Sequence, residues 1–160
     1  MVGGSKVSLV LVPFVFISFT EISQANAASF QGLGHLPGGS CSEATAISAD
    51  GSVVVGTSCT PSGVQAFRWT ATDGIVGIPI PAGLIKSWAA GVSADGNFVV
   101  GYGRKSDSPP YGYEGFRWHV SGGMDRITDG GINVLAHAIS GDGSIASSTW
   151  KYPWTSTRSR

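Results

Sequence analysis

The chain has 160 residues, balances 10 basic against 10 acidic residues, and contains 24 glycines. Nucleic acids and anionic membrane surfaces are bound through concentrated positive charge, so a chain with no net charge and no Lys/Arg cluster fits neither partner. Val, Ile and aromatic residues recur periodically between glycines and prolines, which favours a folded β-rich chain with many tight turns over a disordered one.

Residues 1–27 are predicted to be a secretory signal peptide. An apolar run from Val7 to Phe19 follows Lys6 and precedes Ala25-Asn26-Ala27, which matches the Ala-x-Ala cleavage pattern. The run is shorter than the roughly 20 residues that a membrane span needs, although a retained anchor is the alternative. We expect cleavage after Ala27, a secreted or periplasmic bacterial location, and no membrane insertion of the mature chain.

The segment from Phe30 to Leu36 is predicted as the fourth strand of a repeat unit whose other strands are missing. It precedes Pro37-Gly38-Gly39, just as the predicted strand from Ile75 to Ile80 precedes Pro81-Ala82-Gly83. A terminal strand offset in this way is how propellers close their ring.

Three repeat units follow, and their spacing predicts the fold. An Asp-Gly motif recurs at Asp50, Asp95 and Asp142, with spacings of 45 and 47 residues, and Phe-Arg-Trp recurs at Phe67 and Phe116. Short apolar strands separated by turn sequences fill each unit. The predicted strands are 43–48, 52–58, 65–70 and 75–80 in unit 30–83, then 88–93, 97–103, 112–119 and 124–128 in unit 84–131, then 135–140 and 144–150 in partial unit 132–150, with 151–160 an irregular tail.

Periods of roughly 40 to 50 residues between β-rich units are typical of propeller blades. We therefore expect an all-β fold of tandem four-stranded antiparallel blade-like repeats, that is, an incomplete β-propeller. The chain holds fewer units than the about four blades that a ring needs. Either several chains assemble a ring, or the chain is a truncated member of a longer family, or the units form an open array.

The Asp-Gly pairs are predicted to be structural turn residues. An aspartate in a turn binds its own backbone two residues on, and the following glycine adopts a positive φ. A calcium site would need more oxygen ligands than one such loop supplies. The turn residues are Asp50, Gly51, Asp95, Gly96, Asp142 and Gly143.

Cys41 and Cys59, the two cysteines of the chain, are predicted to form a disulfide, which export permits. If Ala49-Asp50-Gly51 is a three-residue hairpin loop, Ser48 faces Ser52 and the same register places Cys41 opposite Cys59. A reactive-thiol role is the alternative, but neither cysteine has a basic neighbour in sequence.

The repeated arginines and the three histidines are weighed as further candidate sites. Arg68 and Arg117 are predicted to bind turn carbonyls or a repeat carboxylate, with a ligand-facing role as the alternative. His35, His119 and His137 have no further ligand at a metal-binding spacing, so no metal site and no cofactor are expected.

The segment from Arg104 to Tyr113 is the best candidate binding loop. It is longer than the corresponding connection of the first unit and carries Pro109-Pro110, and binding residues tend to lie on loops held by a rigid scaffold. Exposed tyrosines stack on sugars or on protein, so a surface glycan or a protein is the expected partner; a loop without function is the alternative. The candidate binding residues are Arg104, Lys105, Tyr111 and Tyr113.

The units resemble the HAF repeat, an extracellular repeat family of bacteria. The resemblance rests on 32–39 (Gly-Leu-Gly-His-Leu-Pro-Gly-Gly), 44–56 and 66–69 (Ala-Phe-Arg-Trp), which follow one another in the family's order. The second unit has Ile80-Pro81-Ala82-Gly83 in place of Leu-Pro-Gly-Gly, and the third has Ser147-Ser148 in place of Val-Gly. The resemblance implies an exported protein and says nothing of an activity.

No catalytic motif is recognised in the sequence, so we expect a non-enzymatic exported repeat protein that presents loops for binding or assembly. Its expected partners are itself, longer repeat proteins, or a surface glycan or protein. Two alternatives stay open, namely a propeller-type glycan hydrolase or lyase, and a non-functional remnant of a longer repeat protein.

Overall fold

A computed structural model describes residues 30–108, 111–128 and 133–150. The described residues from Gly32 onward belong to one compact unit. The predicted signal peptide over 1–27 and the tail over 151–160 lie outside the described residues. Within the described residues, no helix is long and apolar enough to cross a membrane.

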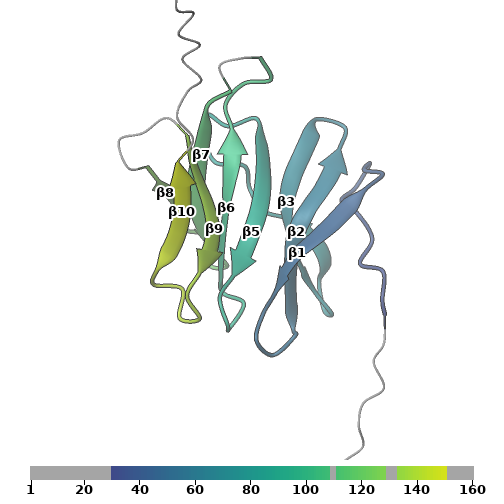
Figure 1. Cartoon of the computed structure of the whole chain (residues 1–160). Coiled ribbons are helices and arrows are strands. Elements are labelled where there is room, and N and C mark those ends of the chain that lie inside the picture. The colour runs from purple at the N-terminus through teal and green to yellow at the C-terminus, as the bar shows by residue number, and fades with distance from the viewer. Residues whose placement is uncertain (1–29, 109–110, 129–132, 151–160) are drawn as a thin grey trace, which may run out of the picture. The chain divides into compact units, whose positions relative to one another are not determined.

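The described residues form three antiparallel sheets, and each sheet is built from strands that follow one another in the chain (Figure 1). The first sheet contains β1 (Ser42–Ile47), β2 (Val53–Thr60), β3 (Gly63–Thr70) and β4 (Gly74–Gly77) in that order. The second contains β5 (Lys86–Val92), β6 (Phe98–Arg104), β7 (Tyr113–His119) and β8 (Met124–Ile127). The third pairs β9 (Val134–Ile139) with β10 (Ala146–Trp150).

The all-β prediction with tandem four-stranded antiparallel repeats is confirmed for the first two units. Turn-forming sequences separate strands of 4 to 8 residues, and within each unit every strand pairs with the next because a tight turn can only join antiparallel neighbours. The described part of the chain shows no closed ring.

The prediction of a strand from Phe30 to Leu36 is wrong. Residues 30–41 contain a turn and no strand, because a strand needs a neighbour that accepts its ladder of hydrogen bonds. Leu36 is nevertheless buried. Its N–H donates to Ser58 Oγ over 3.0 Å, so a single side chain replaces the missing ladder at this point.

The three-residue hairpin loop predicted at Asp50 is also wrong. Ser48 N–H donates to Val53 O over 2.9 Å, so the loop is one residue longer than expected. A β-bulge at Thr45 then shifts the register back by one residue. Beyond the bulge, Ala44 pairs with Gly56, which is the pairing that a three-residue loop would have given. Equivalent bulges fall between Ala89 and Gly91 in the second sheet and at the corresponding place in the third.

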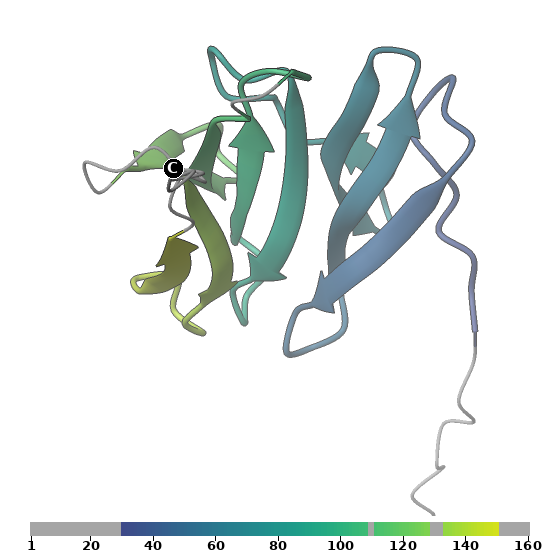
Figure 2. The ribbon, with the colours of Figure 1, turned by 45° about the horizontal axis from the view of Figure 1, so that its top comes forward.

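The core lies between the first two sheets, which pack face to face (Figure 2). Alternating residues of β2 and β3 point toward the second sheet, and alternating residues of β5, β6 and β7 meet them. The buried members are Val53, Val55, Ala66, Ile78, Ala89, Val99 and Phe116.

Candidate functional site

The Asp-Gly tips of the three hairpins share one hydrogen-bond pattern. Asp50 Oδ1 accepts from Ser48 Oγ at 2.7 Å and from Ser52 N–H at 3.0 Å, and Ser48 Oγ accepts from Val53 N–H at 2.9 Å. These donors, led by Ser48, lower the pKa of Asp50 from 3.8 to about 2. The carboxylate thus joins both sides of the loop, which is a structural role.

The other two tips repeat this pattern. Hydrogen bonds from Ser140 and then from Ser144 lower the pKa of Asp142 to about 2. A hydrogen bond from Ser93 is the main cause of the lowered pKa of Asp95.

The glycines of the second and third tips permit neighbouring sheets to approach closely. Gly96 has a φ of 71°, and a Cβ built there would lie 2.4 Å from the Val53 side chain. Gly143, with a φ of 74°, has the same relation to Phe98 at 2.2 Å. A side chain at either position would both strain the backbone and separate neighbouring sheets.

The repeated arginines reach across to the next sheet. Arg68 Nε donates to Gly96 O at 3.3 Å, and Arg117 Nη1 donates to Gly143 O at 3.1 Å. Arg117 also binds Asp125 at 2.7 Å, whereas Val76 occupies the corresponding position beside Arg68. Both arginines therefore bind turn carbonyls, which is the structural role predicted for them from the sequence.

Main-chain bonds connect the same tips. Ala49 N–H donates to Ala94 O at 3.1 Å, and Ala94 N–H donates to Gly141 O at 2.8 Å. The tips lie at one end of the sheets, at the bottom of Figure 1. Each sheet therefore meets the next through one recurring set of contacts.

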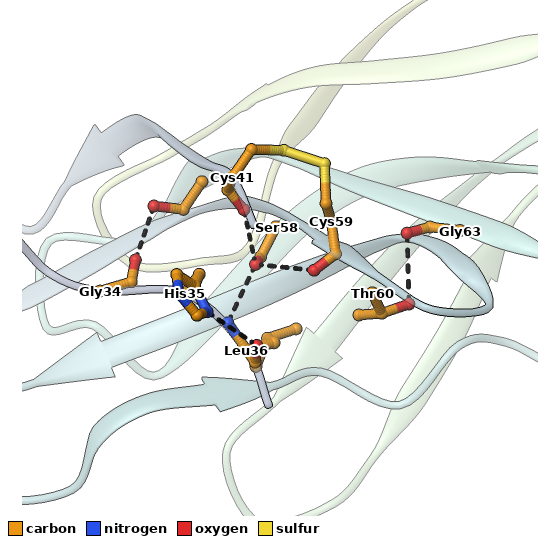
Figure 3. Close-up of a disulfide and its surroundings, with 9 residues drawn as sticks. Gly34, His35, Leu36, Cys41, Ser58, Cys59, Thr60 and Gly63 are labelled. Carbon is orange, nitrogen blue, oxygen red and sulfur yellow. Dashed lines mark hydrogen bonds between the residues drawn. A yellow bond between two sulfur atoms is a disulfide. The ribbon is translucent and has the colours of Figure 1, made fainter. Parts of the chain in front are cut away.

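The predicted disulfide between Cys41 and Cys59 is present (Figure 3). The two Cα atoms are 5.2 Å apart, within the usual range. Ser58 Oγ donates to Cys41 O at 2.9 Å and accepts from Leu36 N–H, so the segment before β1 is tied to β2 beside the disulfide. A disulfide fits an oxidising compartment such as the periplasm or the cell exterior.

The loop from Arg104 to Tyr113 is held by ion pairs on both sides. Asp107 pairs with Lys86 at 2.6 Å and also with Arg104, and these contacts, led by the Lys86 hydrogen bond, lower its pKa. Lys105 pairs with the buried Glu114. Pro109-Pro110 in this loop lies outside the described residues.

The two tyrosines of the loop differ in position. Tyr111 is 43% exposed, and the Arg104 guanidinium lies 5.4 Å from its ring centroid. Tyr113 is half-buried and packs edge-on against Tyr102, with centroids 6.2 Å apart. Arg104 therefore lies beside the exposed ring of Tyr111. Lys105 and Tyr113, in contrast, contact residues of the second sheet.

An aromatic cluster on the second sheet was not predicted. Trp88 stacks on Tyr102 at 5.5 Å between ring centroids, and His137 of β9 lies 6.3 Å from Tyr102. Burial raises the pKa of Tyr102, and the charge on Tyr113 adds to this effect. A signal for this cluster was present in the sequence. When the strand register that pairs Cys41 with Cys59 is applied to the second unit, it pairs Trp88 with Tyr102, as the structure does.

The histidines lie apart from one another. His35 Nδ1 lies 3.1 Å from Leu36 O, His119 Nδ1 2.6 Å from Ser121 Oγ, and His137 Nε2 2.9 Å from Thr149 Oγ1. Among the described residues, no group of three or more His, Cys, Asp or Glu side chains is placed to hold a metal ion.

Comparisons with protein-family models, with curated proteins and with solved structures find no match to this chain. The resemblance to HAF repeats accordingly stays a prediction from the motifs.

Proposed function

We propose that this is an exported, non-enzymatic bacterial repeat protein, related to the HAF repeats, whose units are propeller-type blades. Its role is to present the loop from Arg104 to Tyr113 to a surface glycan. The disulfide supports export because such bonds persist in oxidising compartments. The order of the strands and the recurring contacts between sheets support the blade assignment.

The observation that carries the binding proposal is the exposed ring of Tyr111 beside Arg104. The apolar face of a sugar ring packs on an aromatic side chain, while neighbouring charged groups bind its hydroxyls. Asp107, which is 57% exposed, binds the same Arg104 and supplies carboxylate acceptors. Its ion pairs with Lys86 and Arg104 hold the loop in place before a ligand arrives, which reduces the entropy cost of binding.

The test is sedimentation of the mature protein with insoluble cellulose, chitin and peptidoglycan. Tyr111→Ala is expected to abolish retention on the polysaccharide that binds, and Tyr111→Phe is expected to retain it because the ring remains. Far-UV circular dichroism of both variants checks that the sheets are intact. Retention on none of the three polysaccharides, or equal retention of the Ala variant, would refute glycan binding at this loop.

A further inference from the structure

Each sheet has two different faces, and the contact between sheets always joins unlike faces. We call the face that carries Ala89, Val92 and Trp118 in the second sheet its leading face; it packs against the first sheet. We call the face that carries Val53, Val55 and Arg68 in the first sheet its trailing face; it receives the second sheet.

The leading face of the first sheet is uncovered along β1, whereas Ser58 and Phe67 of the neighbouring strands are buried on the same face. Ala44 is exposed, whereas its equivalents Ala89 and Ala136, which lie 45 and 92 residues later, are buried. Ile47 is 61% exposed, whereas Val92, its equivalent in the second sheet, packs against the core. β1 thus carries exposed apolar residues at positions that are covered in the other units.

The trailing face of the third sheet is uncovered as well. Ile145 is 70% exposed, whereas its equivalent Val53 is 3% exposed beneath the tip of the second sheet. Phe98, at the same position in the second sheet, lies beneath the tip of the third. All three equivalent residues are apolar, but only Val53 and Phe98 are covered by the tip of a following sheet.

The backbone groups of the tips are also open at this end. Ala94 O and Gly96 O accept hydrogen bonds from the first sheet. Gly51, the equivalent of Gly96, has only the side chain of Ile47 from its own hairpin within contact of its Cβ position. The space beside Gly51 is therefore open, whereas in the other two tips the equivalent space is filled by Val53 or Phe98 of the preceding sheet.

We propose that the leading face of the first sheet binds the trailing face of the third sheet of a second copy of this chain. The occupant is identified by continuity: the same main-chain hydrogen bond between tips joins first to second and second to third sheet within the chain. Joining unlike faces leaves each copy one open face at either end, so association continues beyond a dimer, into a ring if the rotation closes and a filament otherwise.

The experiment measures the mass of the full mature chain by light scattering over a range of concentrations. Wild type is expected to form species larger than a dimer. Ile47→Glu removes the leading face and Ile145→Glu the trailing face, and each variant alone is expected to be monomeric. An equimolar mixture of the two is expected to give dimers and to stop there, because only one intact pair of faces remains.

Val120→Glu is the matched control, since Val120 is 44% exposed in the turn after β7, outside both faces, and it should assemble as wild type does. Circular dichroism and thiol counting establish that each variant is folded. A wild-type monomer at every concentration would overturn the proposal. So would dimers of Ile145→Glu alone, which indicate that two leading faces meet, or a monomeric mixture.

The inference uses surfaces away from the Arg104–Tyr113 loop, so it can fail separately from the proposed function. Tyr111→Ala is expected to lose glycan retention and to keep the wild-type mass. Ile47→Glu is expected to have the mass of a monomer by light scattering and to keep wild-type glycan retention.

Discussion

The first and second sheets hold the same end of their first two strands by different chemistry. In the first sheet Cys41 and Cys59 are joined covalently. In the second sheet the corresponding residues, 45 positions later, are Lys86 and Arg104, which pair in register and both bind Asp107. A disulfide and a bridged pair of cations therefore occupy one repeat position.

Burial explains why the stronger link is in the first sheet. β1 is exposed along nearly its whole length, whereas Ser87 and Ala89 of β5 are buried against the first sheet. Packing holds β5 in place, while β1 has lost that contribution on its open face. The covalent link thus stands where burial is weakest, and a screened ion pair is sufficient where packing is complete.

The largest expected effect comes from removing the packing that holds the second sheet. Phe116 is fully buried in the core between the sheets. Phe116→Ala is expected to lower the free energy of unfolding by about 3 to 5 kcal/mol. Urea denaturation measures it, and Val76→Ala at an exposed position is the control. A loss no larger than that of the control would show that packing does not hold β5.

Loss of the disulfide is the next largest effect. Cys41→Ser combined with Cys59→Ser opens a loop with a separation of 18 residues, which corresponds to about 3 kcal/mol of unfolding free energy. Amide hydrogen exchange should accelerate more in β1 than in β5, because β5 keeps its packing. Equal acceleration in the two strands would contradict the assigned role of the disulfide.

Exchanging the chemistry between sheets sharpens the comparison. Lys86→Cys with Arg104→Cys places cysteines at the positions equivalent to Cys41 and Cys59, and a second disulfide is expected to form on oxidation. Its separation is also 18 residues, but the lost ion pairs reduce the net gain to less than about 3 kcal/mol. Thiol counting and thermal unfolding measure both outcomes. Two free thiols would show that the sheets differ in backbone geometry.

Asp107→Asn is expected to have a smaller effect. Asp107 is 57% exposed, so its bonds to Lys86 and Arg104 are partly screened by water. The expected result is a small fall in Tm at low salt that disappears at high salt. A fall that persists in high salt would indicate that Asp107 acts through the shape of the loop.

The smallest expected effect is the response of the tips to acid. The pKa of Asp50 and of Asp142 is about 2 in the folded protein, below the ordinary 3.8. Their contribution to stability is therefore complete above roughly pH 4 and declines as the pH falls toward 2. Ser48→Ala should raise the pKa of Asp50, read by NMR titration, while Asp142 stays unchanged as an internal control. An unchanged Asp50 would contradict the assigned cause.

Much of the fold was predictable because it depends on local signals. Each of the ten strands observed from Ser42 onward overlaps a predicted one, since turn sequences and alternation act over a few residues. The strand expected before Leu36 was not found, because apolar alternation cannot show whether a ladder partner exists. The prediction of a three-residue loop at Asp50 was wrong, because the sequence does not reveal the bulge at Thr45 that compensates for the longer loop. Because of that compensation, the predicted pairing of Cys41 with Cys59 was still correct.

The candidate site was predictable in outline only. The loop carrying Tyr111 was recognised by its length and composition, and the turn role of Asp50 follows from local chemistry. The ion pairs of Asp107 and the cluster around Tyr102 depend on which residues face one another across strands and between sheets. That information resides in the register and in the packing of sheets, which no single segment encodes.

The hydrogen bonds from Arg68 and Arg117 end on main-chain oxygens of the next tip. Every residue type supplies a carbonyl, so apart from the glycine at the tip these hydrogen bonds place little demand on the identity of the receiving side chains. A gene segment encoding one unit can therefore be duplicated and then diverge, as the residue after each tip glycine has done at Ser52 and Asn97, while its product still docks. Such a chain can grow or shrink by whole units over evolutionary time without a new interface being invented.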